Sequence, residues 1–248
     1  MRKAYDWSGL SRDLSAWDMD LSEEKKEALG RYYELLSERN RQMNLTAIED
    51  FEGFCRLHVT DSLALLAFLP EKVSREIKGE RLADLGSGAG FPGMILKLFA
   101  REAKVTLIEA QAKRVSFLEE VRVALFPEDA GIRCLQLRAE EAGQEPDHRE
   151  GYSIVTARAV AELSVLLEYA MPLLEVGGIF VAYKSRETEE ETERAAHALE
   201  VLGGRVLQVK DYVLPNSDTE RRLIFLEKVK GTPEKYPRRA GMAKKRPL

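Results

Sequence analysis

A glycine-rich segment is the part of this sequence whose residue types point most directly to ligand chemistry. It follows a short apolar run and reads Asp84-Leu85-Gly86-Ser87-Gly88-Ala89-Gly90-Phe91-Pro92-Gly93. Gly88, Gly90 and Gly93 satisfy the G-x-G-x-x-G spacing of dinucleotide loops, in which a pyrophosphate lies at a helix N-terminus. Asp84 argues for a different ligand, because a carboxylate beside the loop attracts a cationic amine and repels a pyrophosphate.

S-adenosylmethionine fits this charge, since it has an α-amino group and an adenosine but no phosphate. Asp84, Gly86 and Gly88 are therefore the first expected cofactor contacts. Glu109 ends the next apolar run, where an acid accepts hydrogen bonds from both ribose hydroxyls. Nicotinamide cofactors need the same acid, so Glu109 supports nucleotide binding without choosing the cofactor. The alternative is a structural glycine turn beside a solvated glutamate.

Three further strand ends carry candidate site residues. Ala139 and Glu140 follow the third apolar run, where a small residue and an acid suit the adenine ring and its amino group. Arg158 ends the fourth run and Lys184 the fifth. Ligands bind at the carboxyl ends of parallel strands, so both cations are catalytic candidates on the reacting side of the cofactor. The alternative is two surface cations.

Residues that are missing narrow the choice of methyl acceptor. An (Asn/Asp/Ser)-Pro-Pro-aromatic motif, typical of exocyclic amine methylation, is replaced here by Thr156-Ala157-Arg158. Carbon-5 methylation of pyrimidines needs a nucleophilic cysteine, but Cys55 falls in an expected helix and Cys134 in an expected strand. A ring nitrogen such as guanine N7 is left. It already has an in-plane lone pair and needs no general base, so catalysis would be positioning and electrostatics.

The elements that must position these residues are seven short apolar runs. Helical patterns separate the first five runs, which implies parallel pairing through right-handed crossovers. The last two are separated only by residues 214–218 and should pair antiparallel. The fold class expected is α/β, a Rossmann-like, mostly parallel seven-stranded sheet with one reversed strand. The runs are 81–85, 105–108, 132–137, 153–157, 179–182, 205–212 and 222–229.

Two amphipathic helices are expected before the sheet. Residues 22–37 form one, and residues 50–69 form another that buries Phe54, His58 and Leu65 and ends before Pro70. Residues 40–46 are expected to be a polar connection. We therefore divide the chain into an N-terminal helical extension packed on the core (1–75), a cofactor-binding domain (76–230) and a basic C-terminal tail (231–248).

Charge is distributed unevenly along the 248 residues. The formal net charge is −4, but the last 21 residues hold eight lysines and arginines against one acid, Glu234, which gives +7. Aromatic and proline residues among cations suit an RNA-facing segment, whereas the alternative is a solvated end. The expected RNA contacts are Arg238, Arg239, Lys244, Lys245 and Arg246.

Other classes of protein are disfavoured. The sequence has no apolar run of membrane-spanning length and no apolar stretch near its start, so we expect a cytoplasmic protein without a membrane partner. Its two cysteines and three histidines are too scattered to suggest a metal site.

The sequence also resembles a known family over nearly its whole length, the bacterial 16S ribosomal RNA guanine-N7 methyltransferase G family, also called glucose-inhibited division protein B. The most specific matching stretches are Gly88-Ala89-Gly90-Phe91-Pro92-Gly93 and Tyr236-Pro237-Arg238-Arg239. Others are Asn44-Leu45-Thr46, His58-Val59-Thr60-Asp61-Ser62-Leu63, Lys113-Arg114, Arg138-Ala139-Glu140 and Arg158-Ala159. Two departures, Ser153 and Ser185, affect the loops after the fourth and fifth strands without removing an expected contact.

The resemblance implies several properties. Its cofactor contacts fall on Gly86, Phe91, Glu109, Ala110, Gln111, Ala139, Glu140 and Arg158. It implies a substrate guanine near the decoding region of 16S ribosomal RNA, and the small ribosomal subunit or its precursor as partner; we expect a monomer. Asn44 becomes a candidate for contact with the guanine edge, while His58 and Asp61, three residues apart, also suit a polar pair between helices.

Two other functions stay open. A small-molecule methyltransferase would leave the basic C-terminal segment without a role. An inactive RNA-binding assembly factor would not require Asp84, the glycines and Glu109 together.

Overall fold

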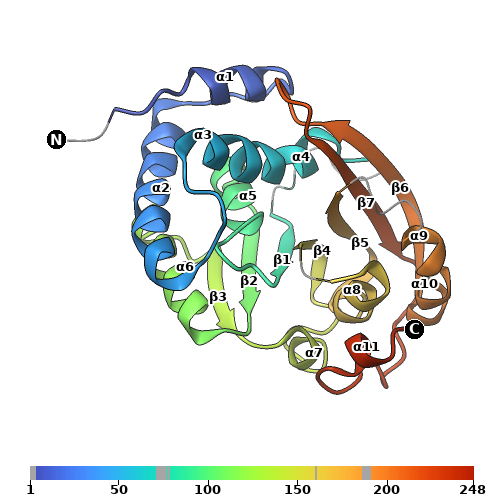
Figure 1. Ribbon diagram of the computed structural model, residues 1–248. Coiled ribbons are helices and arrows are strands. Elements are labelled where there is room, and N and C mark those ends of the chain that lie inside the picture. The colour runs from blue at the N-terminus through green and yellow to red at the C-terminus, as the bar shows by residue number, and fades with distance from the viewer. Residues whose placement is uncertain (1–3, 71–76, 78, 160, 186–190) are drawn as a thin grey trace.

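The centre of the molecule is a β-sheet flanked by helices on both faces (Figure 1). In the computed structural model, which describes residues 4–70, 77, 79–159, 161–185 and 191–248, seven strands are ordered β3-β2-β1-β4-β5-β7-β6. β3, β2, β1, β4 and β5 run parallel, and β7 is antiparallel to both of its neighbours. The strands are β1 Arg81–Leu85, β2 Lys104–Glu109, β3 Ile132–Gln136, β4 Tyr152–Arg158, β5 Leu174–Ser185, β6 Gly204–Val213 and β7 Glu220–Lys228. The expected sheet is confirmed, although β5 begins five residues earlier than expected.

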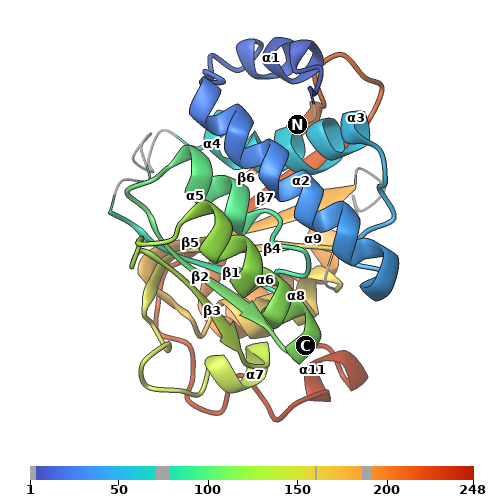
Figure 2. The same cartoon turned by 90° about the vertical axis from the view of Figure 1, so that its left-hand side faces the viewer.

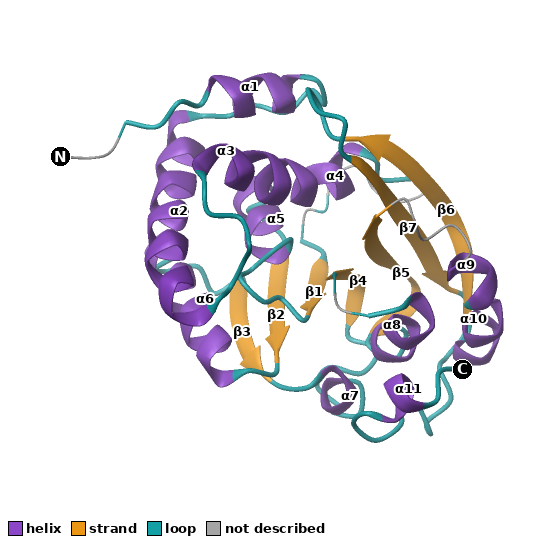
Figure 3. Cartoon of the chain, viewed as in Figure 1, coloured by secondary structure: helices purple, strands orange, loops and turns teal. Residues whose placement is uncertain are grey.

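Each face of the sheet has its own hydrophobic cluster. One face packs against α1, α2, α4, α5 and α6, and Figure 2 shows α2 and α6 side by side in front of the sheet. The other packs against α7, α8, α10 and α11 (Figure 3). The helices are α1 Ser8–Ser15, α2 Glu23–Met43, α3 Phe51–Gly53, α4 Asp61–Ala67, α5 Gly93–Phe99, α6 Ala112–Leu125, α7 Ala139–Ala142, α8 Leu163–Ala170, α9 Glu191–Arg194, α10 Ala196–Leu202 and α11 Met242–Lys245.

The first expected helix ends later than the sequence indicated. α2 begins after Ser22, whose hydroxyl accepts from Lys25 N, and it continues through Asn40 to Met43. The polar connection expected at 40–46 is therefore wrong for its first four residues. The Asn40 side chain bonds both the N–H and the carbonyl of Thr46, so a residue inside the helix shapes the loop that follows.

The second expected helix is confirmed, but part of it has a different winding. α3, a π-helical segment from Phe54 to Thr60, and α4 follow one another without a break. Phe54, His58 and Leu65 are buried as expected. The boundary expected at 75/76 lies outside the described residues. No helix among the described residues is long and apolar enough to cross a bilayer.

The basic C-terminal segment is docked against the protein. Tyr236 and Ala243 are buried, and Arg149 donates to the carbonyl oxygens of Thr232 and Tyr236. The segment therefore covers α7 and α8, and Figure 1 shows α11 beside α7.

Candidate functional site

The glycine-rich loop lies between β1 and α5, at the carboxyl end of the parallel strands (Figure 1). Gly86 and Gly88 have φ values of 65° and 58°, a region that glycine adopts without steric cost. The N–H groups of Gly86 and Ser87 both donate to the Ile108 carbonyl on β2. Gly86 is exposed and Gly88 half-buried, so the loop presents bare backbone along the strand ends.

Helix α2, in the helical extension, contacts this loop through Tyr32. The Tyr32 hydroxyl, which is fully buried, donates to the Ala89 carbonyl. A Cβ added at Gly90 would lie 2.3 Å from the Tyr32 oxygen, so a side chain here would displace that contact. Gly90 is thus required by the approach of α2.

Phe91 is enclosed on both ring faces. Its ring stacks on Tyr32 at 5.2 Å and on His58 at 4.3 Å, centroid to centroid. The Arg158 guanidinium lies 5.4 Å from the ring centroid. Since both faces are covered, the ring serves to join the loop to the helical extension, and only its edge or its backbone is left to meet a ligand.

Asp84 is completely buried. One carboxylate oxygen accepts from Gly93 N at 3.2 Å and the other from the Thr156 hydroxyl at 2.8 Å. Burial raises the pKa of this carboxyl to about 6. A dinucleotide would place its pyrophosphate at the start of α5, where the Asp84 carboxylate would repel it.

The second and third strand ends complete one side of the site. Glu109 accepts from Gly88 N at 3.1 Å and from Gln111 N at 2.9 Å, so it fixes the spacing between the loop and the end of β2. Ala110 and Gln111 are exposed beside it. Glu140, on α7 after the half-buried Ala139, accepts from the backbone N of Gly241 at 2.9 Å. The C-terminal segment therefore contacts an acid that we expected at the adenine.

Arg158 joins the end of β4 to the helical extension. Its Nη1 donates to the Leu57 carbonyl and to Asp61, both at 3.1 Å. Asp61 also accepts from the Tyr212 hydroxyl at 2.9 Å, and Arg221 lies 3.5 Å from it. Thus His58 and Asp61 face a strand-end arginine rather than another helix.

His58 is neutral in this arrangement. Burial, and then the neighbouring Arg158, lower its pKa to about 3. Arg158 Nη2 lies 3.2 Å from Nδ1, and arginine can only donate, so Nδ1 accepts and the ring proton is on Nε2. Nε2 then donates to the Thr46 hydroxyl at 2.8 Å.

The other two catalytic candidates are Lys184 and Asn44. The Lys184 ammonium donates to the Ala161 carbonyl and pairs with Glu191, both at 2.8 Å, and its catalytic role stays a prediction. Asn44 is the exposed C-cap of α2 with φ 48°, two residues before Thr46.

The C-terminal cations divide into two groups. The Nε and Nη2 atoms of Arg238 donate to the carboxylate of the buried Glu168, and Nη2 also donates to the Arg246 carbonyl. The expected RNA contact of Arg238 stays a prediction, and its guanidinium is held within the protein by these bonds. Arg239, Lys244, Lys245 and Arg246 are exposed.

Four residues of the site were not predicted from the sequence: Tyr32, Thr46, Tyr212 and Arg221. Tyr32 lies within the expected helix 22–37 without a signal of its own, and no local signal connects Tyr212 or Arg221 with Asp61. The resemblance did include Thr46, within Asn44-Leu45-Thr46, without giving it a role.

Comparison with known proteins supports a single family. Residues 25–224 match a family described as rRNA small subunit methyltransferase G. A Lactobacillus johnsonii protein named ribosomal RNA small subunit methyltransferase G is 41% identical over 243 residues, covering 96% of this chain and 98% of its own. One of the same name from Acetivibrio thermocellus is 42% identical over 239 residues, covering 96% and 95%. A predicted O-methyltransferase from Agrobacterium tumefaciens shares the fold, with TM-score 0.52 and 21% identity over 68% of this chain and 80% of its own.

The Tyr32 contact predicts a stability effect. Tyr32→Phe keeps the stacked ring but leaves the buried Ala89 carbonyl unpaired, so the free energy of unfolding should fall by about 1–3 kcal/mol. Tyr33→Phe is the matched control, because Tyr33 on the same helix donates to the exposed Glu49 carbonyl, and it should cost under about 1 kcal/mol. Urea unfolding measures both. Equal losses would contradict the role given to Tyr32.

Asp84 predicts a pH dependence. Its pKa rises from 3.8 to about 6 on folding, so the folded state binds this proton more tightly than the unfolded state. The free energy of unfolding should therefore fall as pH rises from about 4 to about 6. Asp84→Asn should remove this contribution of about 3 kcal/mol, seen as a difference between the two pH profiles in denaturant unfolding. Parallel profiles would show that Asp84 does not titrate in this range.

Proposed function

The chain belongs to the rRNA small subunit methyltransferase G family, and we propose that it methylates N7 of a guanine near the decoding region of 16S ribosomal RNA, using S-adenosylmethionine. The observation that supports this most strongly is that Gly86, Gly88, Glu109 and Arg158 all lie at the carboxyl end of the parallel strands. Ligands bind at that end of the sheet in doubly wound folds.

The residues present fit the cofactor. The bare backbone of Gly86 and Gly88 and the buried charge of Asp84 suit the amino-acid part, Glu109 suits the ribose, and Ala110, Gln111, Ala139 and Glu140 surround the adenine end. Asp84 acts by shaping the loop and by its negative charge, since both of its oxygens already have protein partners. When bound, S-adenosylmethionine supplies an electrophilic methyl group.

The protein's part in the transfer is positioning. Guanine N7 has its own lone pair, and the neutral His58 is already committed to Arg158 and Thr46. Burial raises the pKa of both Cys55 and Cys134 to about 12, which disfavours a cysteine nucleophile. Arg158 is the residue assigned to orient the reactants, and Asn44 is a proposed contact to the guanine.

The substrate setting is part of the same proposal. We place the enzyme in the cytoplasm, acting as a monomer on the small ribosomal subunit or its precursor. The exposed Arg239, Lys244, Lys245 and Arg246 beside the adenine end would contact RNA phosphates, and the docked Arg238 would hold the segment in place.

The activity is tested by mapping N7-methylguanine in 16S ribosomal RNA from cells with and without the gene. Cells that carry Arg158→Ala should resemble the deletion, because a lost positioning cation lowers the rate about 100-fold or more. Arg205→Ala is the control, since Arg205 pairs with Glu227 at the far end of β6. A methylation pattern unaffected by the deletion would refute the function, and wild-type activity of a folded Arg158→Ala would exclude that residue.

The C-terminal segment predicts a salt effect. Replacing Arg239, Lys244 and Lys245 by Gln should weaken RNA binding and reduce the slope of log affinity against log salt by about 2, at about 0.7 per phosphate contact. Replacing Lys26 and Arg31 of α2, together with Arg101, which pairs with Glu24 of α2, removes the same charge and should leave the slope nearly unchanged. Equal slopes in both variants would show that the segment does not contact RNA.

A further inference from the structure

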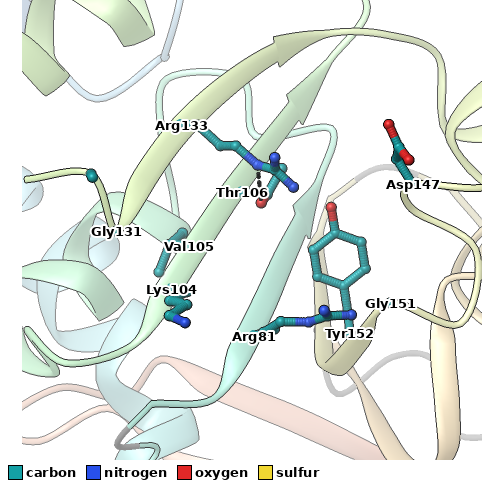
Figure 4. Close-up of a pocket in the computed structure, with 10 residues that line it drawn as sticks. Arg81, Lys104, Val105, Thr106, Gly131, Arg133, Asp147, Gly151 and Tyr152 are labelled. Carbon is teal, nitrogen blue, oxygen red and sulfur yellow. Dashed lines mark hydrogen bonds between the residues drawn. The ribbon is translucent and has the colours of Figure 1, made fainter.

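A recess lies at the opposite end of the sheet from the glycine-rich loop. It has a volume of about 380 Å³ and is formed at the starts of β1, β2, β3 and β4. Figure 4 shows Arg81, Lys104 and Arg133 entering it from three neighbouring strands, with Tyr152 beside Arg81. The proposed reaction gives this recess no role.

The strand register places the three cations together. Arg81 is paired with Lys104, and Arg133 is paired with Thr106, two residues further along β2. Side chains alternate between faces, so all three lie on the face that packs against α7 and α8. Neighbouring strands are about 4.8 Å apart, which distributes the charges over roughly 10 Å.

These cations lack acidic partners among the described residues. Arg133 is oriented by a 3.0 Å hydrogen bond to the Thr106 hydroxyl, and the Arg81 guanidinium lies 6.0 Å from the Tyr152 ring centroid. Asp147 is the one acid lining the recess, so the local charge is +2 in a protein of net charge −4. By contrast, the buried Lys228 is paired with Glu150.

Protection of the sheet edge does not account for this arrangement. Charged residues on an edge strand prevent pairing with other chains, and β3 is such a strand. Arg81 and Lys104, however, lie on β1 and β2, each of which has a strand on both sides. Two of the three cations therefore need another explanation.

We propose that this recess binds phosphates of the substrate RNA backbone, as a second contact remote from the transfer site. Arginine donates in a fixed fork that matches phosphate oxygens, and charges distributed over about 10 Å suit successive phosphates better than one small anion. The inference rests on the proposed RNA substrate. The five residues of β1 separate the recess from the loop by about 16 Å, so the bound RNA must span at least that distance to reach both.

The test compares the charge-removing triple variant Arg81→Gln, Lys104→Gln, Arg133→Gln with the parent. Affinity for 16S ribosomal RNA should fall and the salt slope should decrease by about 2, while S-adenosylmethionine affinity is unchanged. In turnover, KM for the RNA should rise with kcat retained. Arg133→Lys keeps the charge but loses the fork, so it should keep the salt slope of the parent, and the Lys26, Arg31, Arg101 triple to Gln controls for net charge. Melting temperature confirms that each variant is folded.

Unchanged RNA affinity in the folded triple variant would overturn the proposal. If the parent then also shows calorimetric binding of inorganic phosphate that the triple variant loses, the recess is a small-anion site. Binding is measured without turnover, so failure of the parent to methylate RNA would count against the proposed function and not against this contact.

Discussion

The arrangement of the site depends on the contacts of the buried Asp61 carboxylate. Asp61 belongs to the helical extension, and its carboxylate contacts Arg158 of β4, Tyr212 of β6 and Arg221 of β7. A buried carboxylate is tolerated only when it is paired and hydrogen-bonded, and breaking such a pair leaves an uncompensated charge inside the protein. These partners therefore keep the extension and the sheet in one relative position.

Aromatic packing connects Asp61 and its partner Arg158 with the glycine-rich loop. Arg158 fixes the neutral ring of His58, His58 stacks on Phe91, and Phe91 stacks on Tyr32, which bonds the loop carbonyl of Ala89. Burial, and then the neighbouring Arg158 cation, disfavour a second proton on His58 and lower its pKa. The helical extension thus forms one side of the candidate site.

Local sequence patterns predicted the features that depend on residues close together in the sequence. The strands, the reversed β7 and the glycine-rich loop followed from periodicity and turn residues. Partners far apart in sequence did not: Arg158 meets Leu57, Asp61 and His58 only in the folded protein, and no local pattern connects Lys184 with Glu191. Likewise, eight cations in the C-terminal segment suggested a solvated or RNA-facing tail, whereas the buried Glu168 that anchors Arg238 lies on α8.

If the cofactor lies where we propose, charge balance explains how an arginine is tolerated beside it. A free guanidinium at the end of β4 would repel a sulfonium, and the low dielectric of a half-buried site would strengthen that repulsion. Asp61 lies 3.1 Å from Arg158 and 3.5 Å from Arg221, so these three groups sum to +1, and Asp84 adds a negative charge behind the loop above about pH 6. The four groups then sum to zero, and Arg158 keeps its directional N–H groups. The carboxylate that fixes the position of Arg158 therefore also offsets part of the repulsion between Arg158 and a sulfonium.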